Sequence, residues 1–589
     1  MAVDKLITDH IDIWSSALQT RSTAGRGSNG KIDLYGIKKL RELILELAVR
    51  GKLVPQDPND EPASELLKRI AAEKAELVKQ GKIKKQKPLP EINEDEKPFE
   101  LPEGWEWTSL CEISEINPKI EVANDEQEIS FVPMPCVSTR FDGVHEQEIR
   151  KWAEVKKGYT HFANGDIALA KITPCFENSK AAIFNGLKNG VGVGTTELHV
   201  ARPCSAEINL QYILLNIKSP NFLSVGESRM TGSAGQKRVP KSFFENYPLP
   251  FPPIAEQIRI VETFSQLMTI CDQLEQQSLT SLDAHQQLVE TLLTTLTDSQ
   301  NAEELAKNWA RISQHFDTLF TTEVSIDALK QTILRLAVMG KLVPQDPNDE
   351  PASELLKRIE QEKVQLVKEG KIKKQKPLPP VSDEETFLVV PERWTICRLQ
   401  EVTNLITDGK HGDCNNRVDS GYYFLSAKDI NDGKLNYTFA RQIEHEEFLE
   451  VHNRTNLQVG DICMVNTGAT VGKLAIVEDA NLAANTTFQK SVAVIKPCSP
   501  FVYNLYIYLF LESQTLALRM KSGGSAINNL LLGDLKRKLI PLPPLKEQYR
   551  VVNKVNELNK LCDILKSRLQ SAQQTQLHLA DALTDAALS

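Results

Sequence analysis

A twenty-residue segment, GKLVPQDPNDEPASELLKRI, occupies positions 51–70 and recurs without a change at 340–359. The match extends to 35 identities in 40 positions between 51–90 and 340–379, and it includes a second identical block, GKIKKQKPLP. Because near-identical segments of this length adopt the same local structure, a repeat with a period of about 290 residues constrains the fold more than any local pattern.

The repeat continues beyond the opening segment at almost the same offset. Three further pairs match: IKKLRELILELAV from Ile37 with IDALKQTILRLAV from Ile326, LPEGWEWTSL from Leu101 with VPERWTICRL from Val390, and PLPFPPIAEQIRIV from Pro248 with PLPPLKEQYRVV from Pro541. Between these ends, residues 111–245 and 400–538 align only in fragments such as GDIALAKI and GDICMVNT. The chain is therefore two tandem halves with matched ends and divergent middles.

Size and composition indicate a multidomain protein of ordinary globular type. A chain of 589 residues with 41% apolar and 25% charged residues is too long for one hydrophobic core. No apolar run reaches the length of a membrane span, and the N-terminal MAVDKLITDHIDIW carries acids within its apolar stretch, unlike a signal peptide. We therefore expect a cytoplasmic protein, and the net charge of −9 does not rule out a local basic surface.

The matched ends have helical periodicity. Apolar residues recur at spacings of three or four from Ile37 to Leu47 and from Ile326 to Leu336. Pro62 and Pro351 stand where a following helix would begin, and Gly81 and Gly370 where it would end.

A long helix is expected after each PLP phrase. Its apolar stripe has the spacing of a coiled-coil seam, and the eight seam residues are Val261, Phe264, Met268, Cys271, Val552, Val555, Cys562 and Leu565. Two near-copies in one chain favour a mutual antiparallel coiled coil, with two ordinary amphipathic core helices as the alternative.

The middles contain short β-rich runs separated by Gly, Asn and Asp, with one helical piece each, INLQYILLNI and FVYNLYIYLFL. The predicted fold class is α+β, with two globular α+β domains separated by long helices in a pseudo-twofold tandem repeat. The predicted segments are an N-terminal helical region at 1–100, domains at 101–250 and 390–542, a central helical region at 251–389 and a C-terminal helix at 543–589.

Catalytic motifs are weak. GATVGKL at Gly468 lacks the spacing and the Ser or Thr of a P-loop, and no methyltransferase motif of the Asn-Pro-Pro-aromatic type occurs. A nuclease built on scattered residues such as Asp166 and Lys171 stays open as a minor alternative. Late in each middle, however, positive charges gather in glycine-containing loops, which suit phosphates and base edges: Arg229, Lys237, Arg238 and Lys241, then Lys521, Lys536, Arg537 and Lys538.

Each half combines three motifs: an LPxGW or VPxxW phrase, a GDI strand at Gly165 or Gly460, and a closing PLPxPPxxEQ or PLPPLKEQ. In this combination the chain resembles the specificity subunit of type I restriction-modification enzymes. The resemblance covers about residues 32–585, and the helical region that precedes the first variable domain looks like the family B (type IB) organisation.

The resemblance implies two target recognition domains, each reading one half of a split DNA sequence, with the long helices as a ruler. It implies double-stranded DNA, two methyltransferase subunits and two motor-nuclease (restriction) subunits as partners. This chain would carry no catalysis and bind no cofactor, because S-adenosylmethionine belongs to the methyltransferase subunit and ATP and Mg²⁺ to the motor-nuclease subunit. Adenine methylation and restriction would be directed to the sites that this chain selects.

By position, the resemblance places DNA contacts on loops of both middles. The first middle offers Lys171, Thr173, Asn178, Lys180, Gln236, Lys237 and Arg238, and the second Asp408, Lys410, His411, Asn466, Thr467, Thr470, Lys473, Asn528 and Asn529. The repeated arms would dock the methyltransferase subunits, through Ile44, Leu47, Leu66, Leu67, Ile333, Leu336, Leu355 and Leu356.

Two other readings stay open. The chain could be an assembly scaffold that bridges identical partners without touching DNA, because divergent middles between matched arms fit that role as well. It could also be an enzyme in its own right, which the missing motifs make less favourable.

Overall fold

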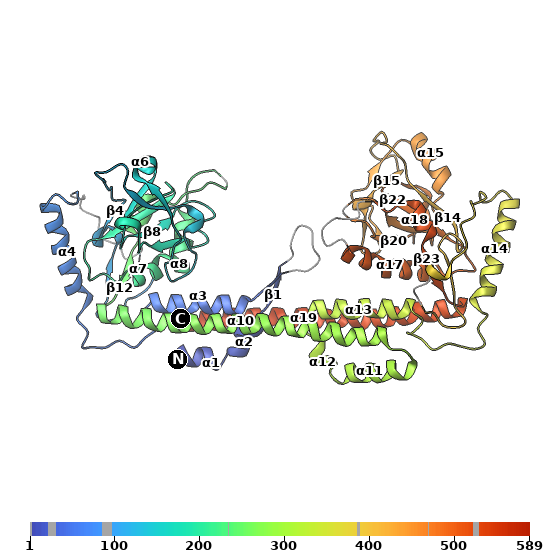
Figure 1. Ribbon diagram of the computed structural model, residues 1–589, viewed down its shortest axis with the longest axis horizontal. Helices are drawn as coiled ribbons and strands as arrows, with labels where there is room; N and C mark the ends of the chain where they lie inside the picture. Colours follow the sequence, from blue (N-terminus) through green and yellow to red (C-terminus); the bar gives the residue numbers. More distant parts are fainter. Residues whose placement is uncertain are drawn as a thin grey trace. The chain divides into compact units, whose positions relative to one another are not determined.

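The structure is a computed structural model that describes residues 3–21, 31–84, 97–233, 235–385, 389–468, 470–521 and 529–588 (Figure 1). The chain forms two compact units, one of Met1–Ser281 with Ala572–Ser589 and the other of Leu282–Ser571. These units cut across the five segments expected from the sequence, because each unit combines a repeated arm, one middle domain and parts of both long helices. Among the described residues, no helix is long and apolar enough to cross a membrane.

The repeated arms are helical where the periodicity predicts. In the first half they form α3 (Tyr35–Val49) and α4 (Ala63–Lys79), and in the second half α13 (Glu323–Val338) and α14 (Ala352–Lys368). Pro62 and Pro351 cap the starts of α4 and α14, and Gly81 and Gly370 follow their ends with φ of +71° and +70°. The helix boundaries read from proline and glycine are confirmed.

Shorter elements precede α3 and α13. They are α1 (Val3–Thr8), α2 (Ile11–Ser16) and the β1–β2 ladder (Gln19–Arg21 with Lys31–Asp33) in the first unit, and α11 (Ala302–Gln314) and α12 (Phe316–Leu319) in the second. Trp14 is 1% exposed, and it helps to anchor the N-terminal helices against α3.

The two middles share one α+β framework. Each begins and ends with a paired strand: β3 (Glu106–Thr108) with β12 (Leu249–Phe251), and β13 (Thr395–Arg398) with β23 (Leu539–Leu542). The LPxGW and PLP phrases therefore recur because they close each domain, which brings residues about 140 positions apart into one ladder.

The main sheets have matching strand orders, β4-β11-β8-β9 and β14-β22-β19-β20. The strands are β4 (Ser114–Ile116), β11 (Leu198–Pro203), β8 (Ile167–Ala170), β9 (Ala181–Ile183), β14 (Thr403–Asp408), β22 (Val492–Pro497), β19 (Ile462–Val465) and β20 (Leu474–Ile476). The same order in divergent sequences confirms that the middles share a fold.

A second sheet in each domain contains one parallel pair, β5–β10 or β15–β21. Its strands are β5 (Glu128–Val132), β6 (Glu148–Lys151), β7 (Thr160–Ala163) and β10 (Val191–Gly194) in the first domain, and β15 (Tyr423–Leu425), β18 (Arg441–Gln442) and β21 (Thr486–Phe488) in the second. The second domain adds the small β16–β17 ladder (Ile430–Asn431, Lys434–Leu435).

Helices complete each domain, and one helix in each is hydrogen-bonded to a closing strand. They are α5 (Leu110–Ile113), α6 (Trp152–Val155), α7 (Leu210–Ile217), α8 (Pro220–Ser228) and α9 (Lys241–Asn246), then α15 (His445–Thr455), α16 (Ala480–Ala484), α17 (Asn504–Lys521) and α18 (Leu532–Arg537). The buried hydroxyls of Tyr212 on α7 and Tyr506 on α17 donate to the carbonyls of Pro250 and Pro541, at 3.0 and 2.5 Å.

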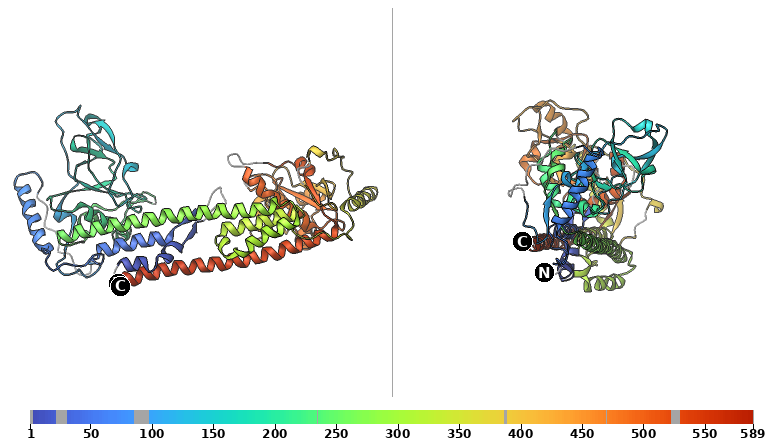
Figure 2. Two further views of the ribbon diagram at one scale, coloured as in Figure 1. Left: turned by 60° about the horizontal axis from the view of Figure 1, so that its bottom comes forward. Right: turned by 90° about the vertical axis from the view of Figure 1, so that its left-hand side faces the viewer.

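Each long helix passes through both units. Residues 254–281 of α10 (Ile254–Asp298) lie in the first unit and 282–298 in the second, whereas α19 (Leu545–Leu588) starts in the second unit and ends in the first. In the first unit, Arg41 on α3 forms ion pairs of 2.6 Å with Asp272 and Glu275 on α10, and the two helices lie side by side (Figure 2).

A repeated lysine holds the C-terminal end of each long helix. The Lys52 ammonium donates to the Leu588 carbonyl of α19 at 2.9 Å, and its copy Lys341 donates to the carbonyls of Thr297 and Ser299 at the end of α10, at 2.6 and 2.8 Å. These carbonyls have no partner within the helix, and a cation there also complements the helix dipole. The GKLVPQDP segment thus fixes where the long helices end.

In the first unit, the apolar stripe of α10 packs against that unit. The Phe264 and Phe141 ring centroids are 5.4 Å apart, and Val261 and Met268 line the same cavity of about 990 Å³ beside the first middle domain. In the second unit, Val552, Val555 and Cys562 of α19 share one hydrophobic cluster with residues of α13 and with Val289, Leu293 and Leu296 of α10. Side chains of both long helices thus share a core there, while the pairing of the eight predicted seam residues with one another stays a prediction.

Most of the predicted docking set is buried within the chain's own units, and docking through Leu67 and Leu356 stays a prediction. Six of its residues are at most 7% exposed, namely Ile44, Leu47, Leu66, Ile333, Leu336 and Leu355, and Leu67 and Leu356 are half-buried. The periodicity identified apolar faces correctly, but those faces pack within the chain's own units because burying them stabilises each unit by about 25 cal/mol per Å² of apolar surface.

Replacing Lys341 with methionine should loosen the end of α10. Because a charged cap of this kind contributes about 1 kcal/mol, amide exchange at residues 292–298 should accelerate roughly fivefold. Hydrogen–deuterium exchange of the full chain measures this. Lys357→Met is the matched control, because within the described part of the chain this lysine forms an ion pair with exposed Glu354 alone. Equal exchange in both variants would contradict the capping role.

Candidate nucleic-acid interface

Two loops of the first domain meet at one end of its main sheet. The loop 171–180 follows β8, and the segment 235–238 lies against it, because the Thr173 amide donates to the Lys237 carbonyl at 3.0 Å and Ile172 forms a bridge with Arg238. The structure thus brings together five predicted contacts that are far apart in sequence: Lys171, Thr173, Gln236, Lys237 and Arg238.

Part of the positive charge on this surface is compensated. The Arg238 guanidinium donates to Glu197 at 2.9 Å, and this hydrogen bond lowers the pKa of the Glu197 carboxyl, which stays ionised. Lys237 is exposed and Lys171 half-buried, and neither ammonium lies within 4.0 Å of a carboxylate among the residues that the structure describes, although the charge of Lys171 also lowers the pKa of Glu197. These two ammonium groups are therefore the cations most available to a phosphate.

The loop 171–180 is fixed from below. The Lys180 ammonium donates to the Met134 carbonyl at 2.9 Å, so it supports the loop, whereas Asn178 at the tip is exposed. Ser179 has φ of +53°, in the left-handed region that favours glycine. The loop therefore makes a tight turn at Ser179.

Lys218 is a residue that the sequence did not single out. It follows α7, is 2% exposed, and donates to the carbonyls of Ser179 and Ser138 at 2.8 and 3.3 Å. A lysine that ends the apolar run YILLNIK was the available signal. Lys218 therefore holds the loop 171–180 against the end of α7.

Arg229 and Lys241 have local partners. The Arg229 guanidinium lies 5.9 Å from the Phe243 ring centroid, and the Lys241 ammonium pairs with Glu245 at 2.6 Å. Neither residue is joined to the 171–180 loop by a hydrogen bond among the described residues.

The second domain repeats the loop junction with different side chains. Thr467 forms a bridge with Asn529, and its hydroxyl donates to the Asn529 carboxamide at 3.2 Å. Lys410 forms a bridge with Gln489, and Leu530 donates to the Asn466 carbonyl at 2.7 Å. Asn528 lies outside the described residues, as does the side chain of Lys521.

Most of the cations predicted in this domain are paired. The Lys410 ammonium lies 3.0 Å from Glu450, His411 Nε2 lies 3.0 Å from Asp408, and the Lys473 ammonium donates to Asn431 at 2.7 Å. Thr470 is half-buried, and Asn466 is 4% exposed with no donor to its Oδ1 among the described residues. The surface thus offers polar groups in fixed orientations more than free positive charge.

The aspartate of each GDI phrase is structural. Asp166 is 1% exposed and accepts two hydrogen bonds from Arg202 at 2.7 and 2.8 Å, and Asp461 pairs with Lys496 at the matching position. Burial raises the pKa of both carboxyls, which the paired cations oppose. Asp166 is therefore occupied in joining β8 to β11, and a nuclease built on it is not supported.

The folded protein should respond to the titration of Lys218. Burial lowers the pKa of Lys218 to about 7, and the ordinary value is about 10.4. Between these values the unfolded chain holds a proton that the folded chain has released, so stability rises with pH. The unfolding free energy of the wild type relative to Lys218→Met should increase from about pH 6.5 to about pH 9.5 in urea titrations. Exposed Lys237→Met should leave the wild-type pH profile unchanged, and a parallel profile for Lys218→Met would contradict this assignment.

Comparison with known proteins adds to this geometry. Residues 102–284 and 391–574 match the family model described as the type I restriction modification DNA specificity domain. The two matched ranges begin at the LPxGW and VPxxW phrases and end within the long helices, so each includes one middle domain with its loop junction.

Two relatives match over their whole length. The chain is 67% identical to the EcoEI specificity subunit and 65% identical to the EcoAI specificity subunit, both type I restriction enzymes of Escherichia coli, and in each case the match covers 100% of both chains. The crystal structure of the HsdS subunit from Thermoanaerobacter tengcongensis matches with 17% identity and a TM-score of 0.39, over 84% of this chain and 98% of that one. The family model and the full-length relatives agree with the resemblance seen in the motifs: the chain belongs to the type I restriction modification DNA specificity family.

Proposed function

We propose that this chain is a non-catalytic specificity subunit whose two middle domains each read one half of a bipartite, non-palindromic DNA site. The site that the chain selects is where two methyltransferase subunits methylate adenine. Two motor-nuclease subunits then join, and restriction depends on the same selected site. The EcoEI and EcoAI relatives, which are named specificity subunits, support this role. S-adenosylmethionine, ATP and Mg²⁺ are assigned to the partner subunits.

One observation carries the proposal. The same backbone junction occurs in both domains with different side chains on it: Thr173 meets Lys237 in the first, and Thr467 meets Asn529 in the second. Two domains with one framework and different exposed groups suit two different half-sites, in the way that a dimeric repressor uses one framework twice for a palindrome.

The chemistry of the junctions fits DNA. Lys171 and Lys237 suit phosphates, and amides such as Asn178, Gln236 and Asn529 suit adenine edges. Arg238 and Lys410 are held in place by carboxylates. This orients their side chains for base edges and reduces the net charge that they contribute to DNA affinity. With few free cations, the chain alone should bind DNA weakly and depend on its partners for phosphate neutralisation.

The two junctions should respond differently to mutation. In the assembled complex, Lys237→Ala should weaken binding to all sequences alike and reduce the salt slope by about 1, as loss of a phosphate contact does. Asn529→Ala should instead relax discrimination at one base pair of the second half-site, by about 1–3 kcal/mol. Binding titrations on half-site libraries measure both, with Lys357→Ala as a control. No enrichment of any sequence by the wild-type complex would favour a scaffold that does not read DNA.

The long helix should set the number of unread base pairs between the half-sites. Sequencing of methylated adenines in cells with the complete system reports both half-sites and their spacing. An insertion of four residues within 255–296 of α10, about one helical turn, should change that spacing and leave the half-sites themselves unchanged. Identical spacing in the lengthened variant would overturn the ruler.

A further inference from the structure

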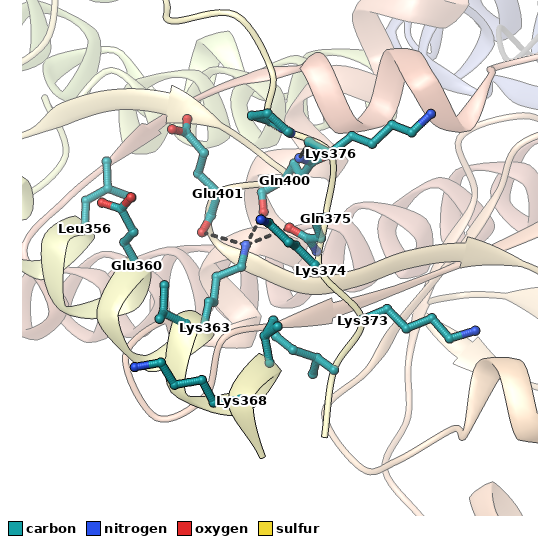
Figure 3. Close-up of a pocket in the computed structure, with 14 residues that line it drawn as sticks. Leu356, Glu360, Lys363, Lys368, Lys373, Lys374, Gln375, Lys376, Gln400 and Glu401 are labelled. Carbon is teal, nitrogen blue, oxygen red and sulfur yellow. Dashed lines mark hydrogen bonds between the residues drawn. The ribbon is translucent and has the colours of Figure 1, made fainter. Parts of the chain in front are cut away.

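A groove of about 490 Å³ lies in the second unit between α14 and the segment 372–377 that follows it (Figure 3). Its apolar lining comes from the α14 side chains Leu356, Val364 and Val367 and from Ile372. Val364 is 50% exposed although it stands on an amphipathic helix. The groove is thus an apolar strip that the described part of this unit leaves open to solvent.

Lysines surround this strip. Lys368, Lys373, Lys374 and Lys376 line the groove and are exposed, and Figure 3 shows Lys368, Lys373 and Lys376 extending outward. None of the four forms an ion pair with a carboxylate among the described residues. Only two acids, Glu360 and Glu401, line the groove, so its charge is clearly positive.

A fifth lysine gives the groove its shape. The Lys363 ammonium donates to the carbonyls of Gln400 and Thr403 at 2.8 and 3.1 Å, and to Gln375 Oε1 at 2.8 Å. The Gln375 carboxamide in turn donates to the Asn404 carbonyl at 2.8 Å. These bonds attach α14 and the lysine-bearing segment to the start of β14, so the groove is a built feature of the unit.

An acidic segment follows the lysines, and its Glu385 is bound elsewhere. Residues 382–385 follow the lysines, but the Glu385 carboxylate accepts from Arg398 at 2.9 Å and from the Ser382 amide at 3.2 Å. Arg398 is itself 4% exposed. The Glu385 carboxylate is therefore bound to Arg398 and Ser382 and not to the groove lysines.

The groove and the recognition loops lie at opposite ends of the same strand. Gln375 contacts β14 at Thr403 and Asn404, whereas the loop 408–411 begins where β14 ends. Six residues of strand place these ends about 17 Å apart. DNA held by the loops is therefore not the natural occupant, and a DNA backbone would not require the apolar strip.

The first half carries the same groove-forming sequence. Of the fourteen lining residues, eleven are identical 289 positions earlier, and Lys74 makes the matching bonds to the carbonyls of Cys111 and Ser114. Residues 85–96 lie outside the described part, so the geometry rests on the second unit. The identity indicates that both copies meet the same kind of occupant.

We propose that this groove binds an acidic amphipathic segment of a protein partner, with apolar side chains on the strip and carboxylates on the lysine rim. Charge complementarity and the open apolar strip together favour this chemistry. A purely acidic ligand would leave the apolar strip exposed to water, and a purely apolar ligand would leave the lysines without counterions. The proposal does not depend on which DNA sequence the domains read.

The test uses the full-length chain with a photo-crosslinking residue, benzoylphenylalanine, in place of Val364. This position is specific to the second groove, since Ala75 stands at the matching place. The probe is a fluorescein-labelled synthetic peptide of glutamates with leucines at helical spacing. Two matched peptides replace all its glutamates with glutamines or all its leucines with glutamates. Val459, 55% exposed in the same unit, is the control position for the crosslinker.

The glutamate–leucine peptide should crosslink at 364 and not at 459, and both matched peptides should react at least about tenfold less, because each lacks one of the two complementary surfaces. The charge reversal Lys373→Glu/Lys374→Glu/Lys376→Glu should abolish the crosslink. The reversal Lys307→Glu/Lys546→Glu/Lys560→Glu, with the same net charge change on exposed lysines elsewhere, should retain it.

Several outcomes would overturn the proposal. They are no crosslink at 364, equal yields at 364 and 459, equal loss in both charge-reversed variants, or equal reaction with the peptide that lacks leucine. If a DNA duplex competes with the peptide for the wild-type chain, and the groove reversal abolishes binding of that duplex, the lysines would be assigned to nucleic acid instead. The half-sites and spacing found by sequencing methylated adenines are a separate readout, so failure of the groove and failure of the recognition role can be told apart.

Discussion

A buried carboxylate at the start of each long helix joins the three phrases that recur in the sequence. Glu256 of the PPIAEQ phrase accepts hydrogen bonds of 2.9 Å from the Trp105 indole of LPEGW and from Gln56 of GKLVPQDP. In the second half Glu547 accepts from Gln345 at 2.7 Å. Burial raises the pKa of both glutamates, and the donors oppose that shift. Arm, domain and long helix depend on this joint because each contributes one of its groups.

Around the joint, repeated ion pairs and lysines position the parts of each half. Asp60 pairs with Arg259 at 2.6 Å and Asp349 with Arg550 at 2.5 Å, so the turn of each arm is fixed to its long helix. Lys52 and Lys341 hold the helix ends, and Lys74 and Lys363 attach α4 and α14 to the domains. The identity of the repeated segments is explained in large part by these contacts within the chain. Lys373, Lys374 and Lys376 belong to one of the identical blocks and line the groove. Their ammonium groups form no ion pairs within the described region.

Local sequence reasoning succeeded where the physical cause is local. Both middles contain the short strands that their β-rich runs predict, and the helices at LQYILLNI and in FVYNLYIYLFL are where apolar periodicity predicts them. It did not foresee that six residues of the docking set are buried within the chain, because periodicity reports that a helix face is apolar and not what covers it. It also missed Lys218 and Glu197, whose roles come from partners 39 and 41 residues away in sequence.

The sequence by itself determined the tandem repeat, the α+β class of the middles, the helix boundaries at Pro62, Gly81, Pro351 and Gly370, and the family. Each of these depends on residue order, spacing or backbone preference, which the sequence records directly. Only the tertiary structure decided that Lys180 supports the loop 171–180, that Asp166 is buried against Arg202, and that both long helices contribute to both units. Those outcomes depend on which side chains meet across long loops and on the burial that follows, and no local pattern in the chain encodes either.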